Sequence, residues 1–160
     1  MGAAEPIVAV LPGLQQHKGF LGLKVNQYNL LITPQRLVFA AMSTQLMKEM
    51  VQAARDRAKA DGANWVGQLG AQFAWMDLLV QRLETMTPDA ILAEFAGSFA
   101  MGRDEVRRIT TRTFGDDDSG RHTHEVRIEA ASGKLKFTLA SKTADEARQI
   151  LVGALPGVVR

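Results

Sequence analysis

The sequence contains no cysteine among its 160 residues. This absence excludes disulfide bonds, thiolate metal sites and a cysteine nucleophile. The sequence also lacks a strong excess of either charge, because 19 Lys and Arg face 17 Asp and Glu, for a formal net charge of +2. Nucleic-acid-binding domains of this size usually carry a larger and more clustered basic excess, so we expect no nucleic acid partner.

Long apolar runs are missing as well. No stretch approaches the roughly eighteen uninterrupted apolar residues of a membrane-spanning helix. The segment before Gly13 has no positive region and only a short apolar run, so it does not predict a signal peptide, and the cytoplasm is the expected compartment. Hydrophobic residues make up 46% of the chain and charged residues 22%, which is typical of a folded protein. We expect a single domain over residues 1–160.

Strand patterns mark the first part of the chain. Residues 7–10 predict a strand that ends in a turn at Pro12–Gly13. Residues 28–33 and 36–41 predict a hairpin, since two apolar runs are joined through a short polar turn. In the second run, Leu37 and Phe39 are expected on the opposite face from their neighbours.

Helical spacing begins at residue 43. An amphipathic helix is predicted from an N-cap at Ser43 or Thr44 to a stop at Asp61–Gly62. A second helical pattern runs from about residue 65 to 83, and Thr87 is expected to cap a short third helix.

The last third of the chain predicts strands and one helix. Residues 98–101, 106–114, 122–130 and 134–139 have strand character, and the last three form an expected antiparallel meander. Thr143 and Glu146 form a capping box, which predicts a C-terminal helix. The expected segments are 5–42 for three strands, 43–96 for helices, 97–141 for four strands and 142–156 for the helix.

The order of these elements, together with the Leu30–Phe39 hairpin, resembles the pleckstrin-homology-like (PH-like) domain family of prokaryotes. The hairpin has the pattern apolar, apolar, Thr, polar turn, Arg, Leu, apolar, Phe, and the run Gly133–Phe137 and the capped helix are also similar. The resemblance implies an α+β fold: a bent seven-stranded antiparallel sheet or barrel, capped by the C-terminal helix. Residues 43–96 would then be a helical insertion between strands three and four.

The loop between the first two strands is a candidate interaction site. It places apolar side chains between two lysines, a pattern that fits insertion at a membrane surface; the residues are Lys18, Phe20, Leu21, Leu23 and Lys24. The resemblance implies a lipid-binding role for this loop, but Val25, Asn26 and Gln27 stand where phosphoinositide-binding relatives carry further cations. The alternative is a loop packed on the helices or on another subunit.

The helical segment is a second candidate. Trp65, Phe73 and Trp75 do not all fit one helical stripe, so we expect an apolar surface that contacts a partner protein or a second copy of the chain. The alternative is a small satellite core over one end of the sheet.

His122 and His124 are the best metal candidates, since residues two apart on a strand point the same way. Two partly buried histidines with no metal are the alternative. No nucleophile elbow, dinucleotide fingerprint or zinc-hydrolase motif occurs. We therefore expect no cofactor and no enzymatic activity. The leading hypothesis is a binding or scaffolding module for protein interaction or self-assembly, with membrane binding as the first alternative and a metal protein or enzyme as the second.

Overall fold

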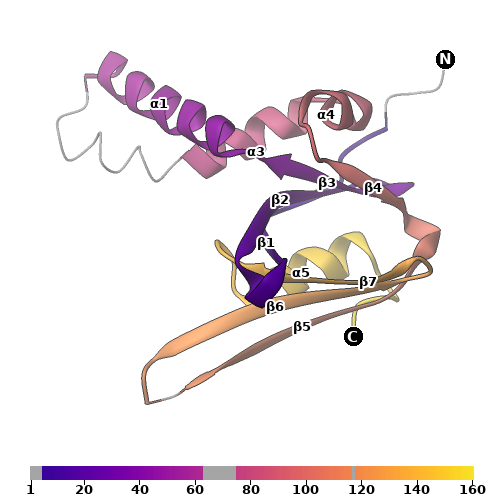
Figure 1. Cartoon of the computed structure of the whole chain (residues 1–160). Coiled ribbons are helices and arrows are strands. Elements are labelled where there is room, and N and C mark those ends of the chain that lie inside the picture. Colours follow the sequence, from indigo (N-terminus) through magenta and orange to yellow (C-terminus); the bar gives the residue numbers. More distant parts are fainter. Residues whose placement is uncertain (1–4, 63–74, 117) are drawn as a thin grey trace.

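The computed structural model describes residues 5–62, 75–116 and 118–160, and its strands form one antiparallel sheet in the order β4-β3-β2-β1-β7-β6-β5 (Figure 1). The strands are β1 (Ala9–Lys18), β2 (Lys24–Ile32), β3 (Arg36–Met42), β4 (Phe99–Gly102), β5 (Val106–Asp116), β6 (Arg121–Ala130) and β7 (Gly133–Leu139). The α+β class is confirmed. The sheet does not close into the barrel that was one form of the expected fold, because β4 and β5 are the two edges of an open sheet. β4 has only four residues, so it offers little ladder for a closing strand.

Three described helices lie between β3 and β4 in the chain: α1 (Thr44–Ala60), α3 (Trp75–Thr85) and α4 (Pro88–Glu94). A fourth, α5 (Ala144–Ala154), packs against β1, β5 and β6. The predicted caps are confirmed: the Ser43 hydroxyl accepts from the Leu46 N–H at 3.0 Å, and Thr143 forms a capping box with Glu146. The backbone N–H of Thr143 donates to the Glu146 carboxylate and lowers the pKa of that group.

The predicted turn at Pro12–Gly13 is wrong, since β1 runs through it to Lys18. The register against β2 shifts between Leu11 and Leu14, which makes this dipeptide a β-bulge. The bulge is held from both sides: the Gly13 N–H donates to the buried Asn29 Oδ1 at 3.1 Å, and the Gly13 carbonyl accepts from the Ala140 N–H at 2.8 Å. Proline suits a bulge because it has no N–H to leave unpaired.

Gly13→Ala should destabilise the protein by about 1–3 kcal/mol, measured by chemical denaturation. Gly13 has φ +73°, and an added Cβ would stand 2.6 Å from the Ser141 Oγ. Gly62→Ala is the matched control, because Gly62 has φ +76° but open space around its Cβ position. Equal losses in the two variants would show that the contact with Ser141 contributes nothing.

The sheet separates two hydrophobic clusters, and β3 contributes to both. Leu37 and Phe39 belong to the larger cluster, which α5 helps to cover. Val38 and Ala40 point the other way, into a cluster formed with residues of α1, α3 and α4. The predicted alternation along this strand is therefore confirmed, and both of its faces are buried.

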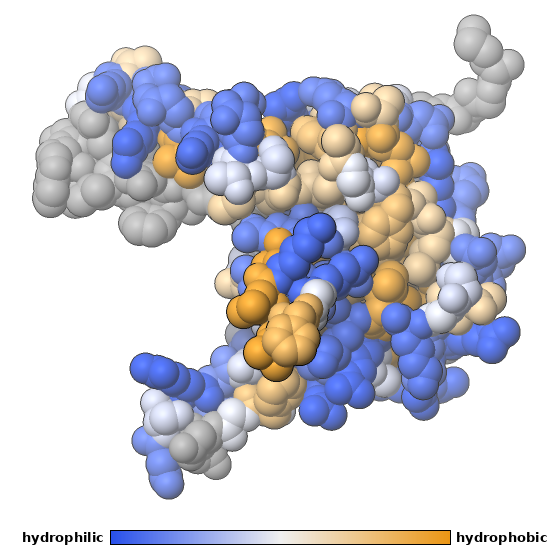
Figure 2. All heavy atoms as spheres, viewed as in Figure 1, coloured by the Kyte–Doolittle hydropathy of each residue, from blue (hydrophilic) through white to orange (hydrophobic). Residues whose placement is uncertain are grey.

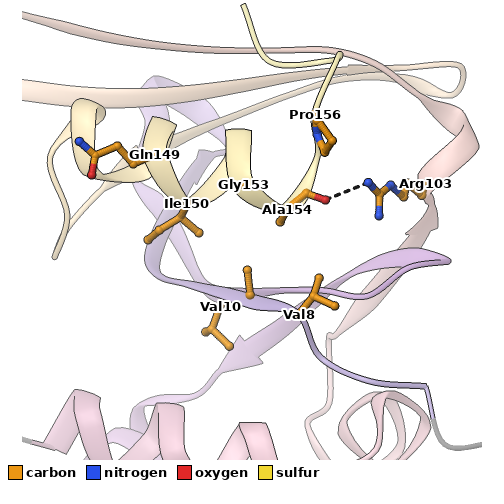
Figure 3. A pocket seen from close by; sticks show the side chains of 9 residues that line it. Val8, Val10, Arg103, Gln149, Ile150, Gly153, Ala154 and Pro156 are labelled. Carbon is orange, nitrogen blue, oxygen red and sulfur yellow. Dashed lines mark hydrogen bonds between the residues drawn. The ribbon is translucent and has the colours of Figure 1, made fainter.

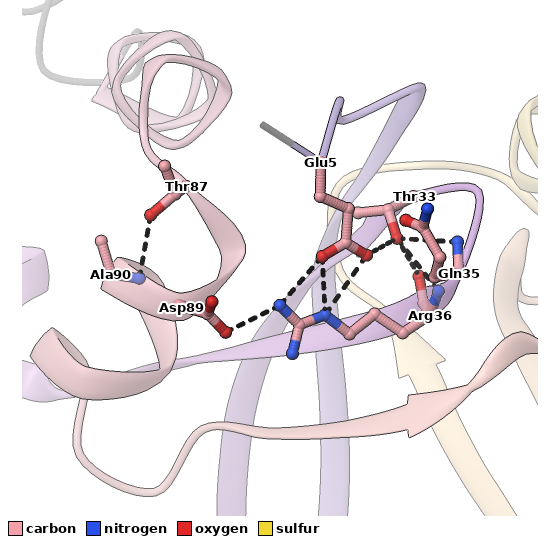
Figure 4. A network of polar contacts seen from close by, with 7 residues as sticks. All are labelled: Glu5, Thr33, Gln35, Arg36, Thr87, Asp89 and Ala90. Carbon is pink, nitrogen blue, oxygen red and sulfur yellow. Dashed lines mark hydrogen bonds and ion pairs between the residues drawn. The ribbon is translucent and has the colours of Figure 1, made fainter. Parts of the chain in front are cut away.

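A polar network fastens the N-terminal segment and α4 to the β2–β3 turn (Figure 4). The Arg36 guanidinium lies 2.9 Å from the Glu5 carboxylate and 2.8 Å from that of Asp89. These two carboxylates, Asp89 first, raise the pKa of Arg36. The Thr33 hydroxyl donates to Glu5 and accepts from the N–H of Gln35 and of Arg36. The network has a structural role, since each of its charged groups, Glu5, Arg36 and Asp89, is already in an ion pair.

Candidate functional site

The loop between β1 and β2 carries the most exposed large apolar side chains of the described residues. Phe20, Leu21 and Leu23 are 84%, 81% and 79% exposed. Figure 2 shows an apolar cluster protruding among polar side chains near the centre of this face, where the loop lies in Figure 1. The alternative of a loop packed against the protein's own helices does not fit exposures this high.

The backbone of this loop is a short, tight turn. Phe20–Gly22 form the 3-10 turn η1, closed by hydrogen bonds from the Gly22 N–H to the Gly19 carbonyl (3.1 Å) and from the Leu23 N–H to the Phe20 carbonyl (3.3 Å). Leu21 has φ +57°, the one left-handed non-glycine conformation among the described residues. This conformation is costly for a side chain as large as leucine. The turn therefore holds apolar side chains outward at an energetic cost.

The two lysines that flank the turn face each other. Lys18 and Lys24 are directly opposite in the β1–β2 register, and both are exposed. Like charges at opposed positions repel, and no ion pair to either lysine occurs in the described part of the chain. The sequence also has no Asp or Glu between Glu5 and Glu49. An anionic ligand would relieve this repulsion.

The second candidate surface falls largely outside the described residues. Trp65 and Phe73 lie in residues 63–74, which the structure does not describe. Trp75 begins α3, but its side chain is not described. The prediction of an apolar helical surface at these three residues therefore stays a prediction.

The two metal candidates lie on β6, close to the β5–β6 turn. His122 is exposed, and the His124 Nδ1 lies 2.8 Å from the Thr113 Oγ1 across the hairpin. The described residues contain no group of three or more His, Asp or Glu side chains placed to hold a metal ion. Within this part of the chain, His124 has a structural partner and the pair lacks further ligands.

A groove of about 640 Å³ lies between residues 8–10 and α5 (Figure 3). Its walls are mostly apolar: Val8 and Val10 lie on the strand side of the groove and Ile150 on the α5 side, with the Val10 side chain directed away toward the cluster formed with α1, α3 and α4. Its one charged lining residue, Arg103, donates from Nη2 to the carbonyl of Ala154 at 2.8 Å. That bond satisfies the C-terminal end of α5, so Arg103 has a structural role in the groove.

The β5–β6 hairpin has a feature that the sequence reasoning missed. β6 pairs with β7 only from Glu125 to Ala130, whereas it pairs with β5 as far as Arg121. The outer part of the hairpin is therefore a two-stranded ribbon that projects from the body of the protein (Figure 1). Phe114 lies on it, 42% exposed, with the Arg112 guanidinium carbon 4.9 Å from its ring centroid.

Comparison of the chain with protein-family models, with curated protein sequences and with solved structures gave no match. None of the described helices combines the length and the apolar character that crossing a membrane requires.

Proposed function

We propose that this chain is a non-catalytic binding module that attaches reversibly to anionic membrane surfaces through residues 18–24. One observation carries the proposal: three apolar side chains with 79–84% exposure stand on a tight turn between two lysines that form no ion pair with any described residue. Each apolar side chain would contribute up to about 1.5–3 kcal/mol on burial among acyl chains. Each lysine near an anionic surface contributes about 1 kcal/mol.

The fold supports a PH-like assignment as part of the same proposal. Seven antiparallel strands, a C-terminal helix packed on β1 and β5, and helices between β3 and β4 fit a PH-like domain with a helical insertion. In lipid-binding relatives, the loop between the first two strands carries the basic residues. Here Val25, Asn26 and Gln27 follow Lys24, which favours contact with a charged surface over a pocket for one phosphorylated headgroup.

The double variant Phe20→Ser/Leu21→Ser should weaken binding to anionic vesicles by about 100-fold or more, because it removes two of the three inserting side chains. Co-sedimentation with phosphatidylcholine vesicles, with and without phosphatidylserine, measures this. Lys18→Ala/Lys24→Ala should weaken binding to the phosphatidylserine vesicles only. High salt should reduce binding without abolishing it, since salt screens the lysines but not the apolar contact.

Val152→Ser is the matched control, because Val152 is an exposed apolar residue (42%) on α5, away from the loop. It should bind vesicles like the unaltered protein, and none of the variants should change the melting temperature by more than a few degrees. Failure of the unaltered protein to sediment with either vesicle would refute the proposal.

Protein interaction or self-assembly is the second candidate function. The observation that favours it is the outer edge of β5, which has no neighbouring strand in the described part of the chain apart from the bridge at Ile109, and which lies away in sequence from the 18–24 loop.

A further inference from the structure

The outer edge of β5 is covered at one residue only. The Ile109 N–H donates to the Val158 carbonyl and the Ile109 carbonyl accepts from the Arg160 N–H, both at 2.8 Å. Alternate residues of an antiparallel strand direct their N–H and C=O groups to the same side. The backbone groups of Thr111, Thr113 and Gly115 therefore face outward like those of Ile109. Within the described residues, no backbone hydrogen bond reaches these three from that side.

Beyond the residues covered at Ile109, this edge lacks the features that usually prevent one sheet edge from pairing with another. Natural edges carry proline, clustered charge, bulges or a covering segment, or they are short. Residues 110–115 read Thr-Thr-Arg-Thr-Phe-Gly, with no proline and one charge, and their register with β6 is unbroken. Threonine and phenylalanine favour strands. A two-stranded ribbon is also marginal alone, and a further strand would stabilise it.

We propose that the outer edge of β5 pairs with the β5 of a second copy of this chain, antiparallel, about a two-fold axis at Thr113. The sequence is self-complementary in this register. Thr113 lies opposite the same residue of the copy, Thr111 opposite Gly115, and Arg112 opposite Phe114. In the Thr113–Thr113 and Thr111–Gly115 pairs, the outward-facing N–H and C=O groups of the two chains lie opposite each other and exchange hydrogen bonds.

The side chains of the third pair suit each other. Arg112 already lies over Phe114 of its own strand, so both project from the same face of the ribbon. In the paired arrangement each Phe114 ring is also approached by the guanidinium of the copy, a favourable cation–π contact. Glu125, only 4% exposed, lies 3.8 Å from the Arg112 Nε and closer to the Arg127 guanidinium, so it is a shared counter-charge for both arginines of each chain. In an isologous interface the same surface of both copies is in contact, so that surface must be complementary to itself, as the Arg112–Phe114 pairs are.

A single cysteine tests the axis directly, because the chain has none of its own. Opposed residues in a hydrogen-bonded pair have Cα atoms about 5.5 Å apart, within the range that a disulfide spans. Thr113→Cys should therefore give a disulfide-linked dimer under mild oxidation. Val25→Cys, on the internal strand β2 and exposed to 43%, should stay largely monomeric on a non-reducing gel. Equal cross-linking of the two variants would overturn the proposal.

Phe114→Lys tests the energetics without cysteine. It places a lysine opposite Arg112 at two symmetric positions and should weaken dimerisation at least tenfold in sedimentation equilibrium. Val25→Lys should dimerise like the unaltered protein. Phe20→Ser/Leu21→Ser should also dimerise normally, which would show that dimerisation through β5 does not depend on the 18–24 loop. An unaltered protein that stays monomeric at all concentrations, or a Phe114→Lys variant that dimerises normally, would overturn the inference.

Discussion

Removal of residues 142–160 should abolish cooperative folding. The truncation deletes α5 and the C-terminal residues that bond to Ile109. It removes Ala147, Leu151 and Leu155, which are 0–1% exposed in the larger cluster, and it leaves their partners in contact with water. Each buried leucine contributes about 1.5–3 kcal/mol, and removal also leaves the underlying strands uncovered. The combined loss is comparable with the whole stability of a domain of this size, about 5–15 kcal/mol.

Thermal unfolding followed by near- and far-ultraviolet circular dichroism measures this effect. We expect the truncated chain to lose its near-ultraviolet signal and its sharp transition. Val152→Ala is the control on the same helix, because that side chain is exposed, and its stability should change by less than about 0.5 kcal/mol. A truncated chain that still melts cooperatively would mean that the sheet does not depend on α5.

Phe39→Ala should cost about 3–5 kcal/mol, the usual range for a buried phenylalanine. The Phe39 ring is fully buried and stacks on Phe99 and Phe137, with centroid distances of 4.6 and 5.5 Å. Tyr28 meets the same ring edge-on at 6.4 Å. The substitution therefore leaves a cavity at the centre of an aromatic group drawn from four strands.

Urea denaturation gives the free energy of unfolding for this comparison. The melting temperature should fall by about 10 °C, given roughly 2–4 °C per kcal/mol at this chain length. Phe20→Ala removes the same atoms from an 84% exposed position and should change stability by less than about 0.5 kcal/mol. Similar losses in the two variants would contradict the assignment of Phe39 to the core.

The fold was largely predictable where the signals were local. Ser43, Thr87 and Thr143 cap helices through hydrogen bonds to residues three positions later, so the sequence alone reveals them. The bulge at Pro12–Gly13 was not predictable, because a turn and a bulge use the same residues. Asn29 and Ala140, which hold the bulge, are distant in the sequence. Closure of the sheet likewise depends on strand order, which periodicity does not report.

The candidate site was predictable in composition but not in exposure. Phe20, Leu21 and Leu23 have the same sequence pattern whether they pack inward or project, and tertiary structure decides between the two. The β5 edge was missed for a related reason. Residues 106–114 predicted a strand, but no local pattern shows that this strand is the last in its sheet.

Both faces of β3 are buried, and this burial restricts which substitutions and insertions the strand tolerates during evolution. A strand with one solvent-exposed face can tolerate substitution by polar residues at every second position. Here each position from Leu37 to Ala40 is at most 2% exposed, and a one-residue insertion would exchange the residues of the two clusters. Length changes should therefore accumulate in the β5–β6 turn, and substitutions in β3 should conserve volume and apolar character.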